Sequence, residues 1–581
     1  MKASRRFPVV LGLCSFTHDS AAALVAGGHL AGMAEEERLT GVKHTREYPG
    51  RSGAWLLSEA GLTAGDVDVV AYNFAGHRYL GGVVGSAGYL LASATLGRAV
   101  PRAASFAVVH ARYRQRMRAL RQMFPNATVR GVGHHRAHGV YAFTVSGYEQ
   151  AAVLIADSLG ETCTTSIGHA HADGQATRYR IIEAIDDPAS LGYAYGAVTA
   201  HLGWRRGDEE GTVMALAALG DPARFREVLS RAIQVTGTGF ALDPGLFPLR
   251  VLRHGWTRVT PAFIDATCPP RQPGEEIGQV HADLAAALQE RTEQVMVHLA
   301  YRAREVTGSR LLCAGGGVAL NCVAIGKILE EGLFDEVFVP PAPGDSGTSI
   351  GAAIAAHLKT AGVIPSGVTH ACYLGPAYPG FDPGPAPLPG LTARRVVDPA
   401  RFLASQLAAG KIAGLFQGRL EAGPRALGSR SILASPLLPD VNERLNARVK
   451  FRETFRPFAP VVLGGKAARY FQLTQPSPYM SIAVPVTALA RRLIPAVVHV
   501  NGTARVSPRA WLSSDTLGRI KREERSRPIQ RENTATCPYI GGLAGTPRDA
   551  ATPVTRPGAG AIYECPVSTG QMSSLPNLAI P

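Results

Sequence analysis

The sequence contains no long hydrophobic run. No window reaches the ~18 uninterrupted apolar residues that a membrane-spanning helix needs. Residues 1–6 lead directly into an apolar run of strand type, without the features of a signal peptide. We therefore expect a cytoplasmic protein without a membrane partner.

The sequence also lacks paired cysteines. Its 8 cysteines are scattered, and none belongs to a CxxC pair. This pattern argues against a disulfide framework and against a zinc ribbon. With 581 residues, the chain is long enough for about two to four domains, each with its own core.

Acidic residues are outnumbered by basic ones. The formal net charge is +15 at pH 7, which predicts anionic partners. Nucleic acid and phosphorylated small molecules are both compatible with this charge. The densest basic cluster, residues 419–456, is interrupted by glycine and proline, as expected for a compact phosphate pocket, so nucleic acid is the less favoured partner. A second basic run, residues 102–121, has helical spacing and is expected to be a solvated helix face.

One short segment carries two histidines at helical spacing. If residues 134–145 form a helix, His134 and His138 lie one turn apart on the same face, where two imidazoles can share a metal ion. The apolar run 151–156 predicts a buried strand that delivers Asp157 at its carboxyl end. Two imidazoles and a carboxylate suit Fe(II), Mn or Zn. On these residues alone, a metal site and a purely structural role remain equally open.

A strand–turn–strand pattern occurs twice. The strand-like runs are 9–16, 21–25 and 29–34 in the first copy and 151–156, 162–169 and 177–185 in the second. Two copies predict an α/β fold with a duplicated domain and a ligand cleft between its halves. His18 and Asp19, in the polar turn of the first copy, are candidate catalytic residues, and they could equally cap the turn.

A glycine-rich turn follows a predicted strand further along the chain. Gly315, Gly316 and Gly317 precede a helix-like stretch that begins near Asn321. This arrangement is typical of a nucleotide or phosphate cradle, and also of a simple tight turn. The next predicted strand, 334–340, leads to Asp345, a candidate for a further metal ligand.

The composition divides the chain into segments. Residues 361–397 are rich in proline and glycine and are predicted to form a linker. Residues 1–360 then form one domain and residues 398–507 a second. From about residue 508 the sequence is rich in Pro, Thr, Arg and Gly, so residues 508–581 are expected to form an atypical, disordered tail.

Several motifs occur together over residues 8–507. They are His18-Asp19-Ser20-Ala21-Ala22, Glu36-Glu37-Arg38, the histidine motif 134–138, Asp157 to Glu161, Gly315 to Cys322, Pro340 to Gly347 and the arginine segment 416–460. In this order they resemble the O-carbamoyltransferase family, which includes nodulation-factor and antibiotic carbamoyltransferases. The resemblance implies an N-terminal domain related to the tRNA threonylcarbamoyltransferase, with the fold of actin and sugar kinases, and a YrdC-like C-terminal domain.

The resemblance also implies an activity. Family members make carbamoyl-adenylate from carbamoyl phosphate and ATP in the C-terminal domain, and the N-terminal domain transfers the carbamoyl group to a hydroxyl. The expected acceptor is a sugar or an antibiotic scaffold, and the expected cofactors are a divalent metal, iron ahead of manganese and zinc, and Mg with ATP. The implied metal ligands are His134, His138, Asp157 and Asp345, and the implied carbamoyl phosphate and adenylate residues are Arg425, Lys450, Arg456 and Arg505.

The end of the chain departs from the family. Members carry an Asn-Thr-Ser-Phe-Asn motif after Thr-Ala-Arg-Val, and this sequence has none. A reading-frame change near residue 508 is our hypothesis for this difference. Two other functions stay open: a tRNA modifier, because of the basic charge and the relationship to the tRNA enzymes, and a non-catalytic remnant that binds nucleotide or a partner protein.

Overall fold

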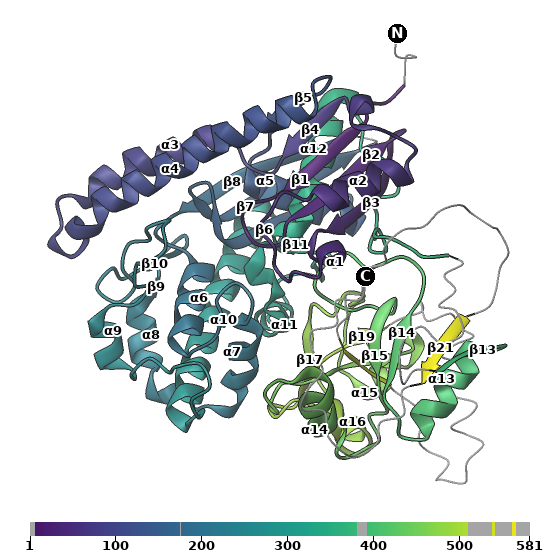
Figure 1. Cartoon of the computed structure of the whole chain (residues 1–581). Helices are drawn as coiled ribbons and strands as arrows, with labels where there is room; N and C mark the ends of the chain where they lie inside the picture. Colours follow the sequence, from purple (N-terminus) through teal and green to yellow (C-terminus); the bar gives the residue numbers. More distant parts are fainter. Residues whose placement is uncertain (1–5, 175, 380–391, 509–536, 541–559, 565–581) are drawn as a thin grey trace. The chain divides into compact units, whose positions relative to one another are not determined.

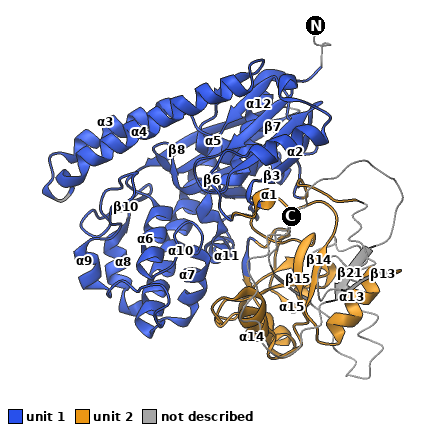
Figure 2. Ribbon diagram, in the orientation of Figure 1, with its two compact units in different colours: residues 1–37, 43–372, 481–483 blue, residues 38–42, 373–480, 484–581 orange. Residues whose placement is uncertain are grey.

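The computed structural model describes residues 6–174, 176–379, 392–508, 537–540 and 560–564 (Figure 1). The chain divides into two units (Figure 2). Unit 1 consists of residues 1–37, 43–372 and 481–483, and unit 2 of residues 38–42, 373–480 and 484–581. Residues 38–42 and 481–483 therefore belong to a different unit from the segments that flank them in the sequence.

The first sheet of unit 1 has five strands in the order β3-β2-β1-β4-β5. The strands are β1 (Val10–Cys14), β2 (Ala21–Ala26), β3 (His29–Glu35), β4 (Val69–Tyr72) and β5 (Thr128–Gly131). β2 pairs antiparallel with β1 on one side and with β3 on the other. β4 pairs parallel with β1, and β5 pairs parallel with β4. Gly27 and Gly28, both with positive φ, form the tight turn between β2 and β3.

The second sheet repeats this topology with the order β12-β11-β6-β7-β8. Its strands are β6 (Gln150–Gly160), β7 (Cys163–Asp173), β8 (Ala176–Asp186), β11 (Leu311–Gly315) and β12 (Glu336–Phe338). β6, β7 and β8 form antiparallel pairs, and β11 and β12 run parallel to β6. The predicted α/β fold with a duplicated domain is therefore confirmed.

Two helices lie between the sheets, α5 (His134–Ser146) and α12 (Thr348–Ala361) (Figure 1). A Cβ atom built on Gly12 would lie 2.1 Å from the carbonyl oxygen of Ser349, and one built on Gly351 would lie 1.9 Å from that of Ala137. The two glycines therefore allow α12 to approach β1 on one side and α5 on the other. α5 in turn packs on β6 and β11, so the two helices join the sheets.

The other helices of unit 1 frame this core. They are α2 (Gly50–Glu59), α3 (Tyr79–Gly85), α4 (Ser93–Met123), α6 (Leu191–His201), α7 (Glu210–Leu216), α8 (Arg226–Ala232), α9 (Pro261–Ala266), α10 (Gln279–Thr307) and α11 (Cys322–Glu330). α4 contains the basic run 102–121. One of its arginines is not solvated as expected, because Arg102 is only 2% exposed and pairs with Asp187. No helix in the described ranges is both long and apolar enough to cross a membrane.

Unit 2 is built on a smaller five-stranded sheet with the order β14-β15-β20-β16-β19. The strands are β14 (Ala413–Phe416), β15 (Arg430–Leu433), β16 (Ala459–Val462), β19 (Ser507–Pro508) and β20 (Cys537–Ile540), and the helices are α13 (Pro399–Ala408), α14 (Val441–Leu445), α15 (Ala467–Tyr470) and α16 (Ala488–Leu493). Ile432, Val441, Leu445 and Phe458 form a buried cluster in this unit. Its YrdC-like character stays a prediction.

Parts of the predicted linker and tail lie outside the described residues. In the linker these are residues 380–391, and in the tail they are 509–536, 541–559 and 565–581. Within the tail, β20 pairs with β15 and β16, and β21 (Gly560–Glu564) pairs with β13 (Thr392–Val396).

Candidate functional site

Two histidines and two aspartates converge in unit 1. The Nε2 atoms of His134 and His138 are 3.1 Å apart. His134 Nε2 lies 3.1 Å from Asp157 Oδ2 and 3.4 Å from Asp345 Oδ1, and His138 Nε2 lies 3.8 Å from each of these oxygens. All four residues are buried, and their ligand atoms lie within 4.8 Å of one another. The structure thus brings all four predicted metal ligands together, and we call them the His/Asp cluster.

The spacing of these atoms suits a single metal ion. Ligand atoms about 2.1 Å from a shared ion lie about 3.0–3.4 Å apart at octahedral or tetrahedral angles. The shortest separations in the cluster, 3.1 and 3.4 Å, fall in this range. Two imidazole nitrogens and two carboxylate oxygens are also a donor set that suits Fe(II), Mn or Zn. The residues therefore fit the predicted metal.

The start of α5 fixes the two histidines. The Glu161 carboxylate accepts hydrogen bonds from the backbone N–H groups of His134, at 3.1 Å, and Ala75, at 2.6 Å. A negative charge at this position also stabilises the N-terminus of the helix. A Cβ atom on Gly160 would lie 2.7 Å from Cδ2 of His134, so glycine leaves room for the ring. The four-residue spacing then places His138 on the same face.

Neighbouring groups orient the cluster without using its ligand atoms. Nδ1 of His134 lies 3.3 Å from the carbonyl oxygen of Asn73, to which it can donate, so Nε2 remains for a metal. The Phe74 ring stacks on His134 with 4.6 Å between the ring centroids. Asp157 Oδ1 accepts a hydrogen bond from the N–H of Gly317 at 3.1 Å, and Oδ2 faces the histidines.

Burial and charge set the protonation of the cluster. Burial opposes a positive charge on His134, but the Asp345 and Asp157 carboxylates outweigh burial and raise its pKa well above the ordinary value. Burial and the charge of His134 lower the pKa of His138 to about 4. Burial raises the pKa of the Asp157 and Asp345 carboxyls, but the histidines more than offset it, so both pKa values are low. One imidazolium therefore faces two carboxylates, which leaves a net negative charge that favours a cation.

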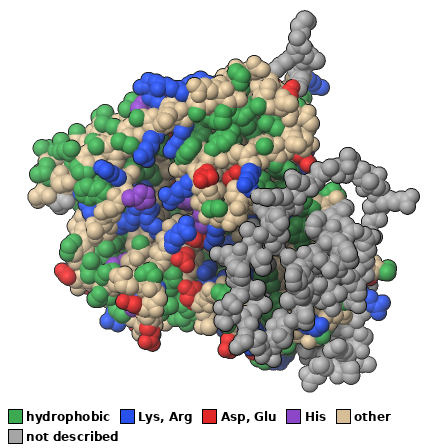
Figure 3. All heavy atoms as spheres, in the orientation of Figure 1, with side chains coloured by type: hydrophobic (Ala, Val, Ile, Leu, Met, Phe, Trp, Pro, Cys, Tyr) green, Lys and Arg blue, Asp and Glu red, His purple; other side chains and the backbone are tan. Residues whose placement is uncertain are grey.

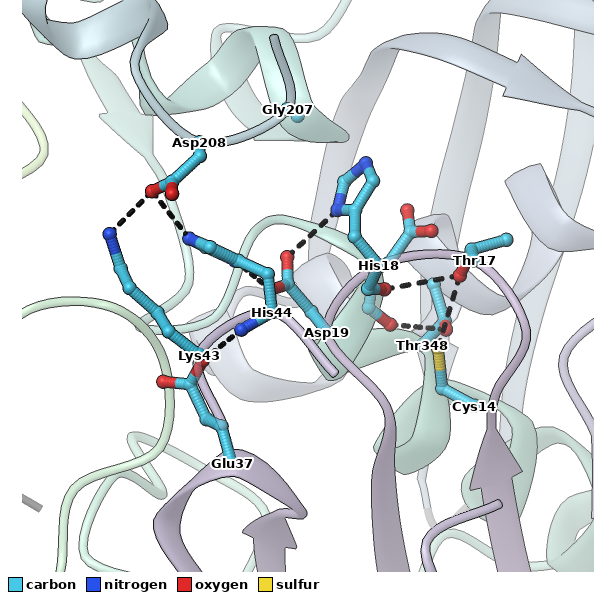
Figure 4. Close-up of polar contacts among 12 residues, drawn as sticks. Cys14, Thr17, His18, Asp19, Glu37, Lys43, His44, Gly207, Asp208 and Thr348 are labelled. Atoms are coloured by element: carbon cyan, nitrogen blue, oxygen red, sulfur yellow. Dashed lines mark hydrogen bonds and ion pairs between the residues drawn. The ribbon is translucent and has the colours of Figure 1, made fainter. Parts of the chain in front are cut away.

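A second polar chain links His18, Asp19, His44 and Asp208 (Figure 4). His18 Nδ1 lies 3.0 Å from Asp19 Oδ2, and Asp19 Oδ1 lies 2.5 Å from His44 Nδ1. His44 Nε2 lies 2.8 Å from Asp208 Oδ1, which also accepts a hydrogen bond from Lys43. The two predicted catalytic residues are therefore hydrogen-bonded to each other at one end of this chain.

The carboxylates of the chain favour protonated imidazoles. Burial lowers the pKa of His18, but the hydrogen bond to Asp19 and the charges of Asp345, Asp19 and Asp157 outweigh it and raise the pKa to about 9. Burial also opposes the charge on His44, and its two carboxylate partners raise its pKa to about 9. Because Asp345 and Asp157 contribute to the shift of His18, this residue responds to the charge of the His/Asp cluster.

The glycine turn after β11 supports the cluster structurally. Gly316 has a φ of +86°, and a Cβ atom there would lie 2.2 Å from the carbonyl oxygen of Ala156. Asn321 begins α11, where its side chain accepts a hydrogen bond from the N–H of Ala324 at 3.1 Å. Nucleotide or phosphate binding by Gly315, Gly316, Gly317 and Asn321 stays a prediction.

The predicted phosphate residues of unit 2 come from separate segments. Arg425 lies between β14 and β15, Lys450 ends the helical turn 446–450, Arg456 precedes β16, and Arg505 ends β18 (Thr503–Arg505). Burial and the charges of Arg456 and Arg505 lower the pKa of Arg452 to about 9. Arg452 therefore lies close enough to Arg456 and Arg505 to feel their charge, which Glu453, 3.8 Å from Arg456 Nη1, offsets in part.

Comparison with known families covers most of the chain. The family described as Carbamoyltransferase N-terminus matches residues 9–354, and Carbamoyltransferase C-terminus matches residues 404–510. The chain belongs to the carbamoyltransferase family. The resemblance stated from the motifs is thereby confirmed, and this carbamoyltransferase is a transferase enzyme.

Individual relatives agree with the family. The nodulation protein NolNO of Sinorhizobium fredii is 34% identical over 512 residues, which cover 85% of this carbamoyltransferase and 70% of the relative. The nodulation protein NolO of Bradyrhizobium diazoefficiens is 36% identical over 382 residues, which cover 64% and 67% of the two chains. Among solved structures, T. kodakarensis HypF is 14% identical, with a TM-score of 0.31 over 63% of this carbamoyltransferase and 49% of HypF.

Some site residues of the carbamoyltransferase were not predicted from its sequence. Asp208 was not singled out, and it lies 164 positions from the histidine that it binds. His44 was not singled out either. Arg452, beside two predicted phosphate residues, was also missed, although its place in the basic segment 419–456 was a usable signal.

Proposed function

We propose that the chain is an ATP-dependent O-carbamoyltransferase that acts on a hydroxyl of a small natural product or sugar. Carbamoyl phosphate, ATP and water give carbamoyl-adenylate, pyrophosphate and phosphate. The acceptor oxygen then attacks the carbamoyl carbon, and AMP leaves with the electron pair of the broken C–O bond. The observation that carries the proposal is the His/Asp cluster, which gathers four buried ligand groups around one point in a member of this family.

The His/Asp cluster is assigned to a divalent cation. His134, His138, Asp157 and Asp345 would hold iron, manganese or zinc through the atoms that face one another. Such a cation acts as a Lewis acid that polarises a carbonyl group.

His18 and Asp19 are assigned to the acceptor hydroxyl. A neutral His18 takes the hydroxyl proton on Nε2, while Asp19 holds Nδ1 and fixes the ring. This role requires a His18 pKa below the value of about 9 that the surrounding carboxylates impose. A cation bound by Asp157 and Asp345 would offset two of those carboxylates and bring the pKa closer to neutrality.

Arg425, Lys450, Arg456 and Arg505 are assigned to carbamoyl phosphate and the adenylate in unit 2. The repulsion that Arg452 experiences from Arg456 and Arg505 supports this assignment. Guanidinium groups bind phosphate oxygens in a fork geometry and offset the charge that develops during adenylation.

The test separates the two half-reactions. We expect pyrophosphate release from ATP that depends on carbamoyl phosphate, and transfer of label from carbamoyl phosphate to one of a panel of hydroxylated metabolites. Arg456→Gln is expected to reduce pyrophosphate release. His138→Asn is expected to leave that release intact and to abolish transfer, because His138 belongs to the other unit.

The alternatives give different results in the same assays. Absence of pyrophosphate release by well-folded protein contradicts the proposal and favours a remnant that only binds nucleotide or a partner. Retention of tRNA at physiological salt, together with transfer to tRNA and not to small acceptors, favours a tRNA modifier.

A further inference from the structure

An arginine without a partner lies beside the candidate catalytic residues. Arg206 is in the loop between α6 and α7, and among the described residues it forms no hydrogen bond or ion pair. The next residue, Gly207, faces the His18 ring, because a Cβ atom built on it would lie 3.6 Å from His18 Cδ2. Asp208 then binds His44 (Figure 4). The backbone of this loop therefore places Arg206 next to the proposed acceptor site.

Two further arginines share one face of α6. The guanidinium carbon of Arg250 lies 4.3 Å from the centroid of the Tyr193 ring, and that of Arg258 lies 5.4 Å from it. Gly196 is three residues further along α6, and a Cβ atom built on it would lie 3.6 Å from Cβ of Arg206. Since positions three apart lie on the same face of a helix, the three arginines gather on one side of α6.

Arg250 is neutralised, but the other two arginines are not. Arg250 Nε lies 3.3 Å from Asp187 Oδ1, and its Nη1 donates to the carbonyl oxygen of Ser158 at 2.9 Å. Arg258 contacts the Tyr193 ring and has no carboxylate partner within the part of the chain that the structure describes. Burial, followed by the charges of Arg258, Arg46 and Arg250, lowers the pKa of Arg206 to about 10.

The acidic residues of the loop form no ion pair with Arg206 or Arg258 in the part of the chain that the structure describes. Glu209 accepts a hydrogen bond from the N–H of Arg205 at 2.7 Å, and Glu210 accepts one from the N–H of Gly207 at 2.5 Å. Asp208 is already paired with His44 and Lys43. Glu210 keeps its charge and lies on the same face, with Oε1 3.2 Å from a Cβ atom built on Gly196. Arg206 and Arg258 still have no ion-pair partner among the described residues. We call them the arginine pair, which a bound anion would stabilise.

Arg250 connects the arginine pair to the His/Asp cluster. Arg250, which shares the Tyr193 ring with Arg258, holds the carbonyl oxygen of Ser158, the residue after Asp157. In Figure 3, several Lys and Arg side chains lie on the face that is drawn, some of them next to histidine side chains. A molecule bound at His18 could therefore extend a charged group to the arginine pair.

We propose that Arg206 and Arg258 bind an anionic group of the acceptor, a phosphate, sulfate or carboxylate, next to the hydroxyl that receives the carbamoyl group. The acceptor class is then an acidic or phosphorylated sugar or similar metabolite, not a neutral or cationic one. This inference rests on the proposed function, because it names the substrate of the same transfer site. Arginine suits this role because its planar fork donates two parallel hydrogen bonds to an oxyanion.

The first experiment measures binding to the full chain. Glucose and N-acetylglucosamine are titrated in parallel with their 6-phosphate and 6-sulfate derivatives and with glucuronate, in the presence of saturating carbamoyl phosphate to fill the arginine site of unit 2. We expect one anionic compound to bind at least about tenfold more tightly than its neutral parent, since hydrogen bonds to charged groups are the strong ones.

Matched variants show whether the arginine pair is responsible. Arg206→Gln with Arg258→Gln is expected to weaken binding of the anionic compound about 10- to 100-fold and to leave the neutral parent unchanged. Arg206→Lys retains part of the affinity because the charge remains. The control is Arg114→Gln, since Arg114 is exposed on α4 and is expected to have no effect.

Pyrophosphate release without acceptor distinguishes this inference from the proposed function. If the wild-type chain releases none, the proposed function is wrong. If release is normal but no anionic compound binds better than its parent, or if the preference survives in the double variant, the inference is wrong. It is also wrong if the double variant raises KM for ATP or carbamoyl phosphate, because the arginine pair would then bind the adenylate.

Discussion

In the described part of unit 1, Asp187 is the only acidic residue shown to pair with both Arg102 and Arg250, which are buried. Replacing Asp187 by asparagine removes this negative charge. Arg102 Nη1 pairs with Asp187 Oδ2, and Arg250 Nε lies 3.3 Å from Asp187 Oδ1. The side chains of Arg102, Asp187 and Arg250 are 3%, 1% and 6% exposed, so water cannot screen the charges. Asparagine keeps the shape of the side chain and leaves two guanidinium groups without a counter-charge.

The expected loss of stability is about 3–5 kcal/mol, the usual cost of breaking a buried ion pair by removing one partner. This loss corresponds to a factor of about 10²–10³ or more in the unfolding equilibrium. It is large because the uncompensated arginines stay buried, with Arg102 packed on the Phe106 ring at 4.9 Å and Arg250 on Tyr193.

Urea unfolding followed by circular dichroism measures the effect. The matched control is Asp335→Asn, which removes the same charge from the Arg310–Asp335 pair on the surface, where the two side chains are 68% and 52% exposed. Solvent and salt screen that pair, so we expect little change. If the two variants lose the same stability, or if Asp187→Asn loses less than about 1 kcal/mol, the buried network does not act as described.

Three further changes test the site. Gly316→Ala places a methyl group 2.2 Å from the Ala156 carbonyl oxygen at a φ of +86°, so thermal unfolding should occur at a lower temperature, and an unchanged midpoint contradicts this packing. The pKa of His44, about 9, lies above its value in the unfolded chain, so the protonated imidazole stabilises the fold. His44→Gln should therefore lose about 3 kcal/mol of stability below pH 6.5, and this loss should disappear as the pH rises through 9. A difference that stays constant with pH contradicts this expectation. His138→Asn should abolish the stabilisation by Mn²⁺ or Zn²⁺ in thermal unfolding, whereas His135→Asn should retain it, since His135 binds Ser166 outside the cluster.

The fold could be predicted wherever the signal was local. Alternating and continuous apolar runs placed β1, β2 and β3 close to their observed bounds. The four-residue spacing of His134 and His138 fixed their common face because a helix has 3.6 residues per turn. Asp157 was found because it directly follows the apolar run 151–156, although β6 itself continues to Gly160.

The rest depended on contacts between distant segments. Helical spacing alone predicted a solvated Arg102, because its partner Asp187 is 85 positions away and no periodicity encodes that pairing. The position of Arg206 beside His18 was not predictable for the same reason, since Gly207 meets that ring only after α6 has packed against the second sheet. Sequence patterns therefore identified the residues of the His/Asp cluster better than the charged residues around them.

The His/Asp cluster has a consequence for how unit 1 assembles. His134 is braced by Asn73 and Phe74 at the end of β4 in the first sheet, while Asp157 ends the buried part of β6 in the second. Neither half of the duplicated domain contains all four residues of the His/Asp cluster, so we expect the proposed ion to bind tightly only after both halves have folded and docked. On this proposal, metal binding would mark the last step of assembly, and a chain that has not reached that step is expected to lose its ion to a chelator.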